Sequence, residues 1–370
     1  MKKNGHHPSG RQRWYCSICR YSTTSTDQRQ QRAKQFHEFL SYVTGTMTRR
    51  QLITTSPTTW DRTHAWCWDT RPTWPQTGEI HDQVFIDGTY IGYNWCVLTA
   101  VCCQGVIAYQ LCHRENKEAY RALLNQIPAP VIVTTDGDKG ALAAIKSCWP
   151  QTRIQRCLVH VQRNIRRVTT SRPKTVQHKA LYQLGLNLTK VTTAEQARAW
   201  EKALFAFHEL YDSWLKERTY RDHVHTIPGF VSANQQWWYT HRDTRRIVSA
   251  LDRYVKNGVL FTYLDPTIAV TTPIASTTNR LEGGTNAVLK AFLHTHRGLS
   301  EPRMLTAIDY FLYSRSVDPQ PLETFMTNTI TTPSPRPEPS HEGPAQIDSH
   351  INHQAPWEDG LTIRKGWLRN

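Results

Sequence analysis

The sequence contains no run of about 18 apolar residues, so nothing in it predicts a membrane-spanning helix. Its nine cysteines, an odd number, follow no regular framework, and no signal peptide precedes them. This usage predicts an intracellular protein with reduced thiols. Acidic residues are also scarce, with 30 Asp and Glu against 45 Lys and Arg. The resulting formal net charge of +15 favours a nucleic acid over a membrane as the partner.

The amino-terminal segment, residues 1–25, contains half of a zinc-ribbon pattern. Cys16 and Cys19 form a Cys-x-x-Cys directly after a basic, aromatic stretch, which is typical of one zinc knuckle. A closed zinc site needs four ligands, and no second Cys-x-x-Cys follows. Two interpretations stay open: the partner knuckle is missing from a shortened chain, or the ribbon is degenerate.

Residues 30–72 predict a small helical region. Phe36, Phe39, Leu40 and Val43 follow the i, i+3, i+4, i+7 spacing of an amphipathic helix. A short basic segment at 48–52 comes next, and Ser56-Pro57 then predicts the start of a helix that runs through Cys67. This succession fits a helix-turn-helix that contacts DNA, and it also fits a plain three-helix bundle.

Residues 83–168 alternate between strand and helix patterns in a defined order. Three strand patterns come first, at 84–87, 95–101 and 107–111, and strands at 131–136 and 152–157 then alternate with helices at 115–127, 139–149 and 159–168. The order predicts an α/β fold of the ribonuclease-H-like type.

The alternation stops after residue 168, which predicts an all-helical insertion over 169–275. A helix capped by Thr192 or Thr193 and another through Ile247 and Leu251 form it. Residues 276–318 then supply the last part of the ribonuclease-H-like domain. Residues 331–370 are rich in Pro, Ser and His, and this composition predicts a disordered tail.

Three carboxylates stand where the predicted elements would bring them together. Asp87 and Asp136 each follow a buried apolar run, and strand ends of an open sheet are where sites form. Glu282, at a helix start after the insertion, is the third. Two Asp and one Glu make an oxygen-only donor set suited to Mg²⁺ or Mn²⁺. Taken alone, Asp87 is better explained as a turn residue that caps its own backbone. Asp138 rivals Asp136 for the second position, and Asp136 is preferred because it directly ends the apolar run.

Four short motifs in this order resemble the Mutator-type transposases of bacterial insertion sequences. They are Ile86–Thr89, Thr135–Gly140, Arg156–His160 with Arg163-Asn164, and Asn279–Glu282. The resemblance spans residues 2–315. It implies a ribonuclease-H-like fold in which Asp87, Asp136 and Glu282 form a DDE triad that binds the catalytic metal.

The resemblance also places the Cys157-x-x-His160 motif beside the triad, where His160 would contact a phosphate oxygen near the scissile bond. Spacing alone would also allow half a zinc site, or a core Cys beside a surface His. Two further groups of side chains could contact DNA. Clustered Arg side chains suit phosphates, although solvated helix faces look the same in sequence, and a Trp can stack on a base, although it is equally explained as a structural residue. The candidates for DNA contact are Arg163, Arg166, Arg167, Trp237, Arg245 and Arg246.

The sequence therefore predicts a metal-dependent transposase that cleaves and joins DNA strands. Its expected partners are double-stranded terminal inverted repeats, target DNA and further copies of itself, in the cytoplasm at the nucleoid. A catalytically silent DNA-binding relic of such an enzyme is the alternative, and an RNA-cleaving ribonuclease is a third. The relic need not keep all three carboxylates, and the ribonuclease would not need the helix-turn-helix.

Overall fold

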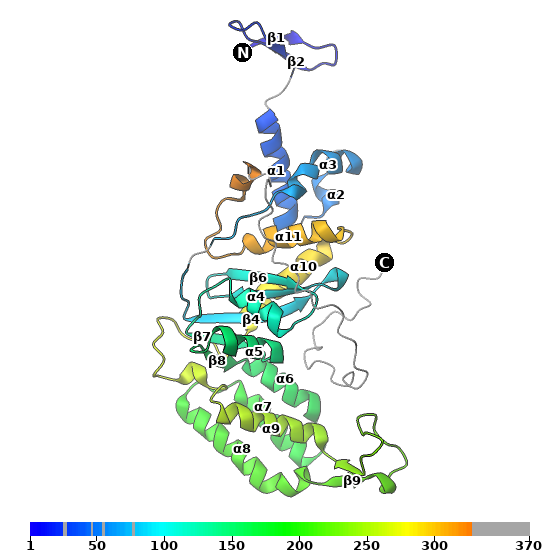
Figure 1. Cartoon of the computed structure of the whole chain (residues 1–370), viewed down its shortest axis with the longest axis vertical. Helices are drawn as coiled ribbons and strands as arrows, with labels where there is room; N and C mark the ends of the chain where they lie inside the picture. The colour runs from blue at the N-terminus through cyan, green and yellow to red at the C-terminus, as the bar shows by residue number, and fades with distance from the viewer. Residues whose placement is uncertain (25–27, 46, 54–55, 76–77, 328–370) are drawn as a thin grey trace. The chain divides into compact units, whose positions relative to one another are not determined.

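The computed structural model describes residues 1–327, apart from 25–27, 46, 54–55 and 76–77 (Figure 1). The predicted tail at 331–370 lies outside the described residues. The described residues form two compact units, one built from residues 1–75 and 289–327 and the other from residues 76–288. No helix in the described part of the chain is long and apolar enough to cross a membrane.

A five-stranded mixed sheet forms the centre of the second unit, which is a mixed α/β structure. Apolar, β-branched runs give its strands; the central strand is buried over residues 83–86, and its two neighbours are buried throughout. The strand order is β6-β5-β4-β7-β8, antiparallel on the β6–β4 side and parallel from β4 to β8. The strands are β4 (Gln83–Tyr90), β5 (Cys96–Val101), β6 (Val106–Cys112), β7 (Ile132–Thr135) and β8 (Arg153–Arg156).

Strand β4 is longer than the sequence predicts. The apolar run suggests a strand that stops at Asp87, followed by a turn. The pairing of β4 with β7 does end at Ile86, which lies opposite Thr135. On its other edge β4 continues to pair with β5 as far as Tyr90. Asp87 therefore sits within β4, at the point where the parallel ladder ends.

Two capped helices pack with the sheet. Helix α4 (Lys117–Leu124) starts at Asn116, whose side chain accepts the Ala119 N–H, and α5 (Lys139–Cys148) starts at Asp138. Tyr120 and Leu123 of α4 join Val84 and Ile86 of β4 in one buried core. The 3₁₀ turn η2 (Gly92–Asn94) links β4 to β5.

Four helices form a second core within the same unit, and they lie together below the sheet in Figure 1. They are α6 (Leu158–Thr169), α7 (Val176–Leu188), α8 (Ala194–Leu215) and α9 (Arg242–Lys256). Leu158, Trp200 and Leu251 belong to their common core, so α6 packs with the helical part. Thr193 caps α8 as predicted. A hairpin of β9 (Arg218–Tyr220) and β10 (Trp237–Tyr239) with η3 (Arg221–His223) precedes α9, and η4 (Thr262–Leu264) follows it.

The chain then enters a π-helix, η5 (Arg280–Asn286), which leads into α10 (Ala287–Thr295). The sequence predicts an ordinary helix here with Leu281, Val288 and Phe292 inward. Leu281 and Phe292 are buried, but Val288 is 39% exposed. The change of helical pitch across η5 alters which positions share a face, so Val288 leaves the apolar side.

The other unit begins with a three-stranded antiparallel sheet of β1 (Lys2–His6), β2 (Gln12–Tyr15) and β3 (Ser22–Thr23). Its helices are α1 (Gln28–Thr44), α2 (Arg49–Leu52), α3 (Pro57–Thr63), α11 (Glu301–Tyr313) and the 3₁₀ turns η1 (Ala65–Asp69) and η6 (Leu322–Thr327). Ser56 caps α3 as predicted, but α3 ends at Thr63 and a 3₁₀ turn carries Cys67. The helix-turn-helix arrangement stays a prediction.

The boundary of the units differs from the predicted domains. Residues 289–318 were expected to complete the α/β domain, whereas α11 packs against α1. The contact is aromatic: the rings of Phe39 and Tyr310 meet edge to face, and the Tyr310 hydroxyl bonds Thr70 Oγ1 at 2.7 Å. A contact between residues so far apart in the chain leaves no periodic signal in the sequence.

Candidate active site

Asp87 and Asp136 stand side by side at the end of the parallel ladder. Ile86 pairs with Thr135, the last residue of β7, and an Asp follows each of them in the chain. Asp136 is buried and its Oδ1 accepts the Thr135 hydroxyl at 3.1 Å and the Asp138 N–H at 3.0 Å. Burial raises the pKa of Asp87 well above its usual range, and the nearby carboxylates of Asp136 and Glu115 raise it further.

Asp138, the alternative to Asp136 as the second carboxylate of the site, caps a helix. Its Oδ1 accepts the N–H groups of Gly140 at 2.7 Å and Ala141 at 3.1 Å, so it is the N-cap of α5. Asp136 therefore stays the preferred partner of Asp87.

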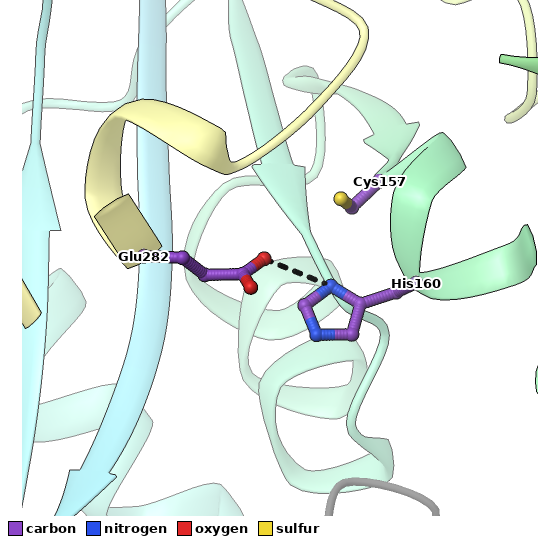
Figure 2. A group of neighbouring side chains, drawn as sticks. All are labelled: Cys157, His160 and Glu282. Atoms are coloured by element: carbon purple, nitrogen blue, oxygen red, sulfur yellow. Dashed lines mark ion pairs between the residues drawn. The ribbon is translucent and has the colours of Figure 1, made fainter. Parts of the chain in front are cut away.

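Glu282, the third predicted carboxylate, is held by a different set of groups. Its Oε2 accepts Arg163 Nη1 at 2.6 Å, and its Oε1 accepts the Thr278 hydroxyl at 2.8 Å. Figure 2 shows Glu282 facing His160 and Cys157, with His160 Nδ1 3.5 Å from Oε1. We searched the described residues for groups of three His, Cys, Asp or Glu side chains whose ligand atoms all lie within 4.8 Å of one another. The one such group is Cys157, His160 and Glu282. Asp87 and Asp136 do not form such a group with Glu282.

The ionisation of this cluster is set by mutual contact. Burial opposes charge on Cys157, yet His160 and Thr278 lower the pKa of its thiol. Burial also opposes a charged His160, but Cys157, Asp136 and Glu282 raise its pKa to about 9. Against burial, His160 and Arg163 lower the pKa of Glu282. Around neutral pH, His160 is therefore a cation that lies between negative groups.

Glu115 is a buried carboxylate close to the two aspartates, and no sequence motif marks it. It precedes the Asn116 cap of α4, and its Oε2 accepts the Tyr120 hydroxyl at 2.8 Å. A Cβ added at Gly88 would lie 2.4 Å from the Glu115 carboxyl carbon, so only a glycine after Asp87 leaves room for it. That glycine was the available signal. Burial is the main cause that raises the pKa of Glu115 to about 7. The hydrogen bond from the Tyr120 hydroxyl lowers this pKa, and the charges of Asp136 and Asp138 raise it.

The raised pKa of Glu115 predicts a pH-dependent cost in stability. The unfolded carboxyl ionises near its ordinary value of 4.5, while the folded one keeps its proton until about pH 7. Stability therefore falls as pH rises through this window. We expect Glu115→Gln, which can still accept the Tyr120 hydroxyl, to gain about 2 kcal/mol at pH 8 and nothing below pH 4.5. Urea unfolding in the presence of chelator measures this, and an equal effect at both pH values would contradict it.

Gly137, between the two loop aspartates, is fixed by a buried arginine. Its φ is +89°, and a Cβ there would overlap the Arg156 guanidinium. Arg156 is buried and lies over the Tyr254 ring at 4.8 Å, so its side chain has no room to move away. The loop that carries Asp136 is thus held against the end of β8.

We expect Gly137→Ala to destabilise the fold by at least about 2 kcal/mol, because it adds both backbone strain and overlap. Gly283→Ala is the matched control, since a Cβ there meets nothing within 4 Å. Thermal unfolding of the two variants compares them. A melting temperature for Gly137→Ala equal to that of Gly283→Ala would show that the Arg156 contact imposes no constraint.

The donor chemistry around Asp87 fits a hard divalent cation. Asp87 and Asp136 offer only carboxylate oxygens, and their repulsion is what a bound cation would relieve. Asn286 adds a buried Oδ1 that no described residue partners. The Cys157, His160 and Glu282 cluster offers the softer donors that suit Zn²⁺.

The amino-terminal cysteines lie in the turn between β2 and β3. Backbone N–H groups of Cys19 and Ile18 lower the pKa of the Cys16 thiol, a feature that suits a metal knuckle. Within the described part of the chain, no third ligand joins Cys16 and Cys19. Zinc binding there stays a prediction.

The predicted DNA-contacting residues fall into two groups. Arg166 and Arg167 are exposed on α6, one turn beyond Arg163. In the hairpin region, Arg218 lies 4.0 Å over the Trp237 ring and Arg245 lies 4.1 Å over the Tyr239 ring. Arg246 is half-buried on α9. One face of Trp237 is therefore already covered by a cation.

The middle of the chain is similar to known transposases. Residues 94–261 match the family model described as "Transposase, Mutator family". The transposase for insertion sequence element IS905 of Lactococcus lactis subsp. lactis (strain IL1403) is 24% identical over 207 residues, which cover 49% of this chain and 50% of that protein. The chain thus spans about half the length of the curated relative that it matches.

Proposed function

The resemblance to Mutator-type insertion-sequence transposases is confirmed by these matches, and from it we propose that the protein is a DDE transposase. Asp87, Asp136 and Glu282 would hold Mg²⁺ or Mn²⁺ on a ribonuclease-H-like sheet, with the helical segment 169–275 as an insertion. One observation carries the proposal: Asp87 and Asp136 are adjacent at the end of the parallel ladder, where burial and mutual repulsion raise the pKa of Asp87.

When bound, the divalent cation would activate a water or a 3′-hydroxyl and stabilise the leaving oxygen of an in-line phosphoryl transfer. Asp87 and Asp136 supply the negative charge that binds it. Glu282 would complete the ligand set from η5, and Arg163 and Thr278 orient its carboxylate.

His160 is proposed to act on the phosphate. As a protonated imidazole between Cys157 and Glu282, it can donate to a phosphate oxygen as charge develops there. Cys157 Sγ, which accepts the Thr278 backbone N–H at 3.3 Å, lies within 4.8 Å of the facing His160 and Glu282 ligand atoms. These contacts fix where the His160 proton is delivered.

The proposed substrate is double-stranded DNA. The excess of basic residues predicts an affinity that falls steeply with salt, because phosphate contacts release counterions. We expect the Arg166→Gln, Arg167→Gln variant to lower the slope of log affinity against log salt by about 2. Lys202→Gln, at an exposed position of α8, is the control that removes charge elsewhere. Fluorescence anisotropy from 50 to 200 mM salt measures the slopes, and equal slopes would remove α6 from the interface.

The proposed activity is tested on DNA fragments that contain the sequence flanking this gene on either side. We expect the full-length chain to cut single strands at defined positions, leaving 3′-hydroxyl ends, in Mg²⁺ or Mn²⁺ and not in chelator. Cleavage that proceeds in chelator would contradict a cation-dependent triad. Specific binding of the ends without cleavage would favour a DNA-binding relic instead.

A further inference from the structure

Asn286 shares its short helix with Glu282. The last backbone bond of η5 runs from the Ala287 N–H to the Glu282 carbonyl, five residues back, which is the π-helical pattern. Residues four positions apart on such a turn lie nearly one above the other, so Glu282 and Asn286 face the same side. Helix η5 contacts β4, the strand of Asp87. π-Helical turns are frequent at functional sites.

The Asn286 side chain is buried, with 4% of its surface exposed. Its Nδ2 donates to Asp87 Oδ2 at 2.8 Å. With Asp87 ionised, as a bound cation would make it, its carboxylate can only accept, and the amide nitrogen then has to face it. The other end, Oδ1, is then a buried acceptor with no donor among the described residues. A buried acceptor without a donor points to a group that binds there.

We propose that Asn286 is a positioning residue of the cation site, a role that rests on the proposed function. Its amide N–H sets the orientation of the Asp87 carboxylate, and its Oδ1 would accept a hydrogen bond from a water bound with the cation. An asparagine suits both tasks, since it donates to a carboxylate without adding charge to a site that already holds several. Through η5, the same helical turn places the Glu282 ligand and the group that orients Asp87.

Two variants separate this role from a structural one. Asn286→Leu keeps the branched shape at Cγ but removes the donor and the acceptor, and it should weaken Mn²⁺ binding by about 10-fold or more. Asn286→Asp keeps an oxygen and loses the donor, so it should bind Mn²⁺ at least as tightly as the parent yet cleave DNA more slowly. Val288→Ala, at an exposed neighbouring position, should change neither. Mn²⁺ affinity is read by electron paramagnetic resonance on the full chain without DNA.

Two results would overturn the inference: parental Mn²⁺ affinity in Asn286→Leu, or an equal loss of affinity and melting temperature in both variants, which would show a purely structural role. Asp87→Asn in the same titration distinguishes failure of the proposed cation site from failure of the role of Asn286. If Asp87→Asn binds Mn²⁺ like the parent, the proposed cation site fails. If Asp87→Asn loses Mn²⁺ and Asn286→Leu does not, only the role of Asn286 fails.

Discussion

Asp87→Asn is expected to lower the rate of strand cleavage by about 10³-fold or more while DNA affinity stays nearly unchanged. The substitution is close to isosteric, but it removes the negative charge that would bind the cation. It also removes a carboxylate whose ionisation is opposed by burial, Asp136 and Glu115. In chelator, we therefore expect Asp87→Asn to melt at a higher temperature than the parent at pH 8. Loss of activity with a gain in stability is typical of a functional site.

The matched control is Asp82→Asn, in the same unit. Asp82 Oδ2 accepts four hydrogen bonds, from the backbone N–H and the hydroxyl of both Thr271 and Thr272. These bonds, above all the one from the Thr271 hydroxyl, lower the pKa of Asp82. Its amide variant should lose stability and keep cleavage, the reverse of Asp87→Asn. Single-turnover cleavage and melting curves on both proteins give the comparison. Cleavage by Asp87→Asn within a few-fold of the parent would exclude Asp87 from the site.

The second large effect is expected at His160. Replacing it by Gln should slow cleavage by about 10²–10³-fold, the typical loss when one donor to a developing negative charge is removed. DNA affinity should change far less, because the contact strengthens as charge develops in the transition state. His178→Gln is the control, since His178 bonds Thr244 Oγ1 at 3.0 Å in the helical part.

His160 also separates the phosphate role from a zinc role. If Cys157, His160 and Glu282 hold zinc, His160→Gln should lose bound zinc and stability together. Zinc content by mass spectrometry, melting temperature and single-turnover rate are measured on one preparation. A slow variant with no zinc in parent or variant supports the phosphate role. An unchanged rate and unchanged zinc would make His160 a bystander.

Local pattern predicted much of the α/β unit. The apolar runs before Asp87 and Asp136 are buried strands in the predicted order, and the capping residue of α8 is Thr193 as expected. These features depend on neighbours in the sequence, so periodicity and capping residues reveal them. The position of Asp87 within β4 depends on pairing with β5, and a strand's own residues do not show where each of its two edges stops pairing.

The missing parts of the site are set by long-range contact. Glu115, in the loop before α4, packs against β4 because Gly88 leaves space, and Asn286 reaches Asp87 from the π-helical turn of η5. Neither residue has a periodicity or motif of its own that marks it. The same holds for α11, whose packing against α1 joins the two ends of the described chain in one unit.

Asp87, Asp136 and Glu282 are proposed to bind a divalent cation at one shared site. Cleavage of the polypeptide by bound Fe²⁺ tests this most directly. With ascorbate and peroxide, Fe²⁺ bound in place of Mg²⁺ generates radicals that cut the polypeptide near its ligands. The account predicts cuts near residues 87, 136 and 282, suppressed by excess Mg²⁺ and absent in Asp87→Asn. Cuts confined to the segment around Cys157, or cuts that survive in Asp87→Asn, would contradict it.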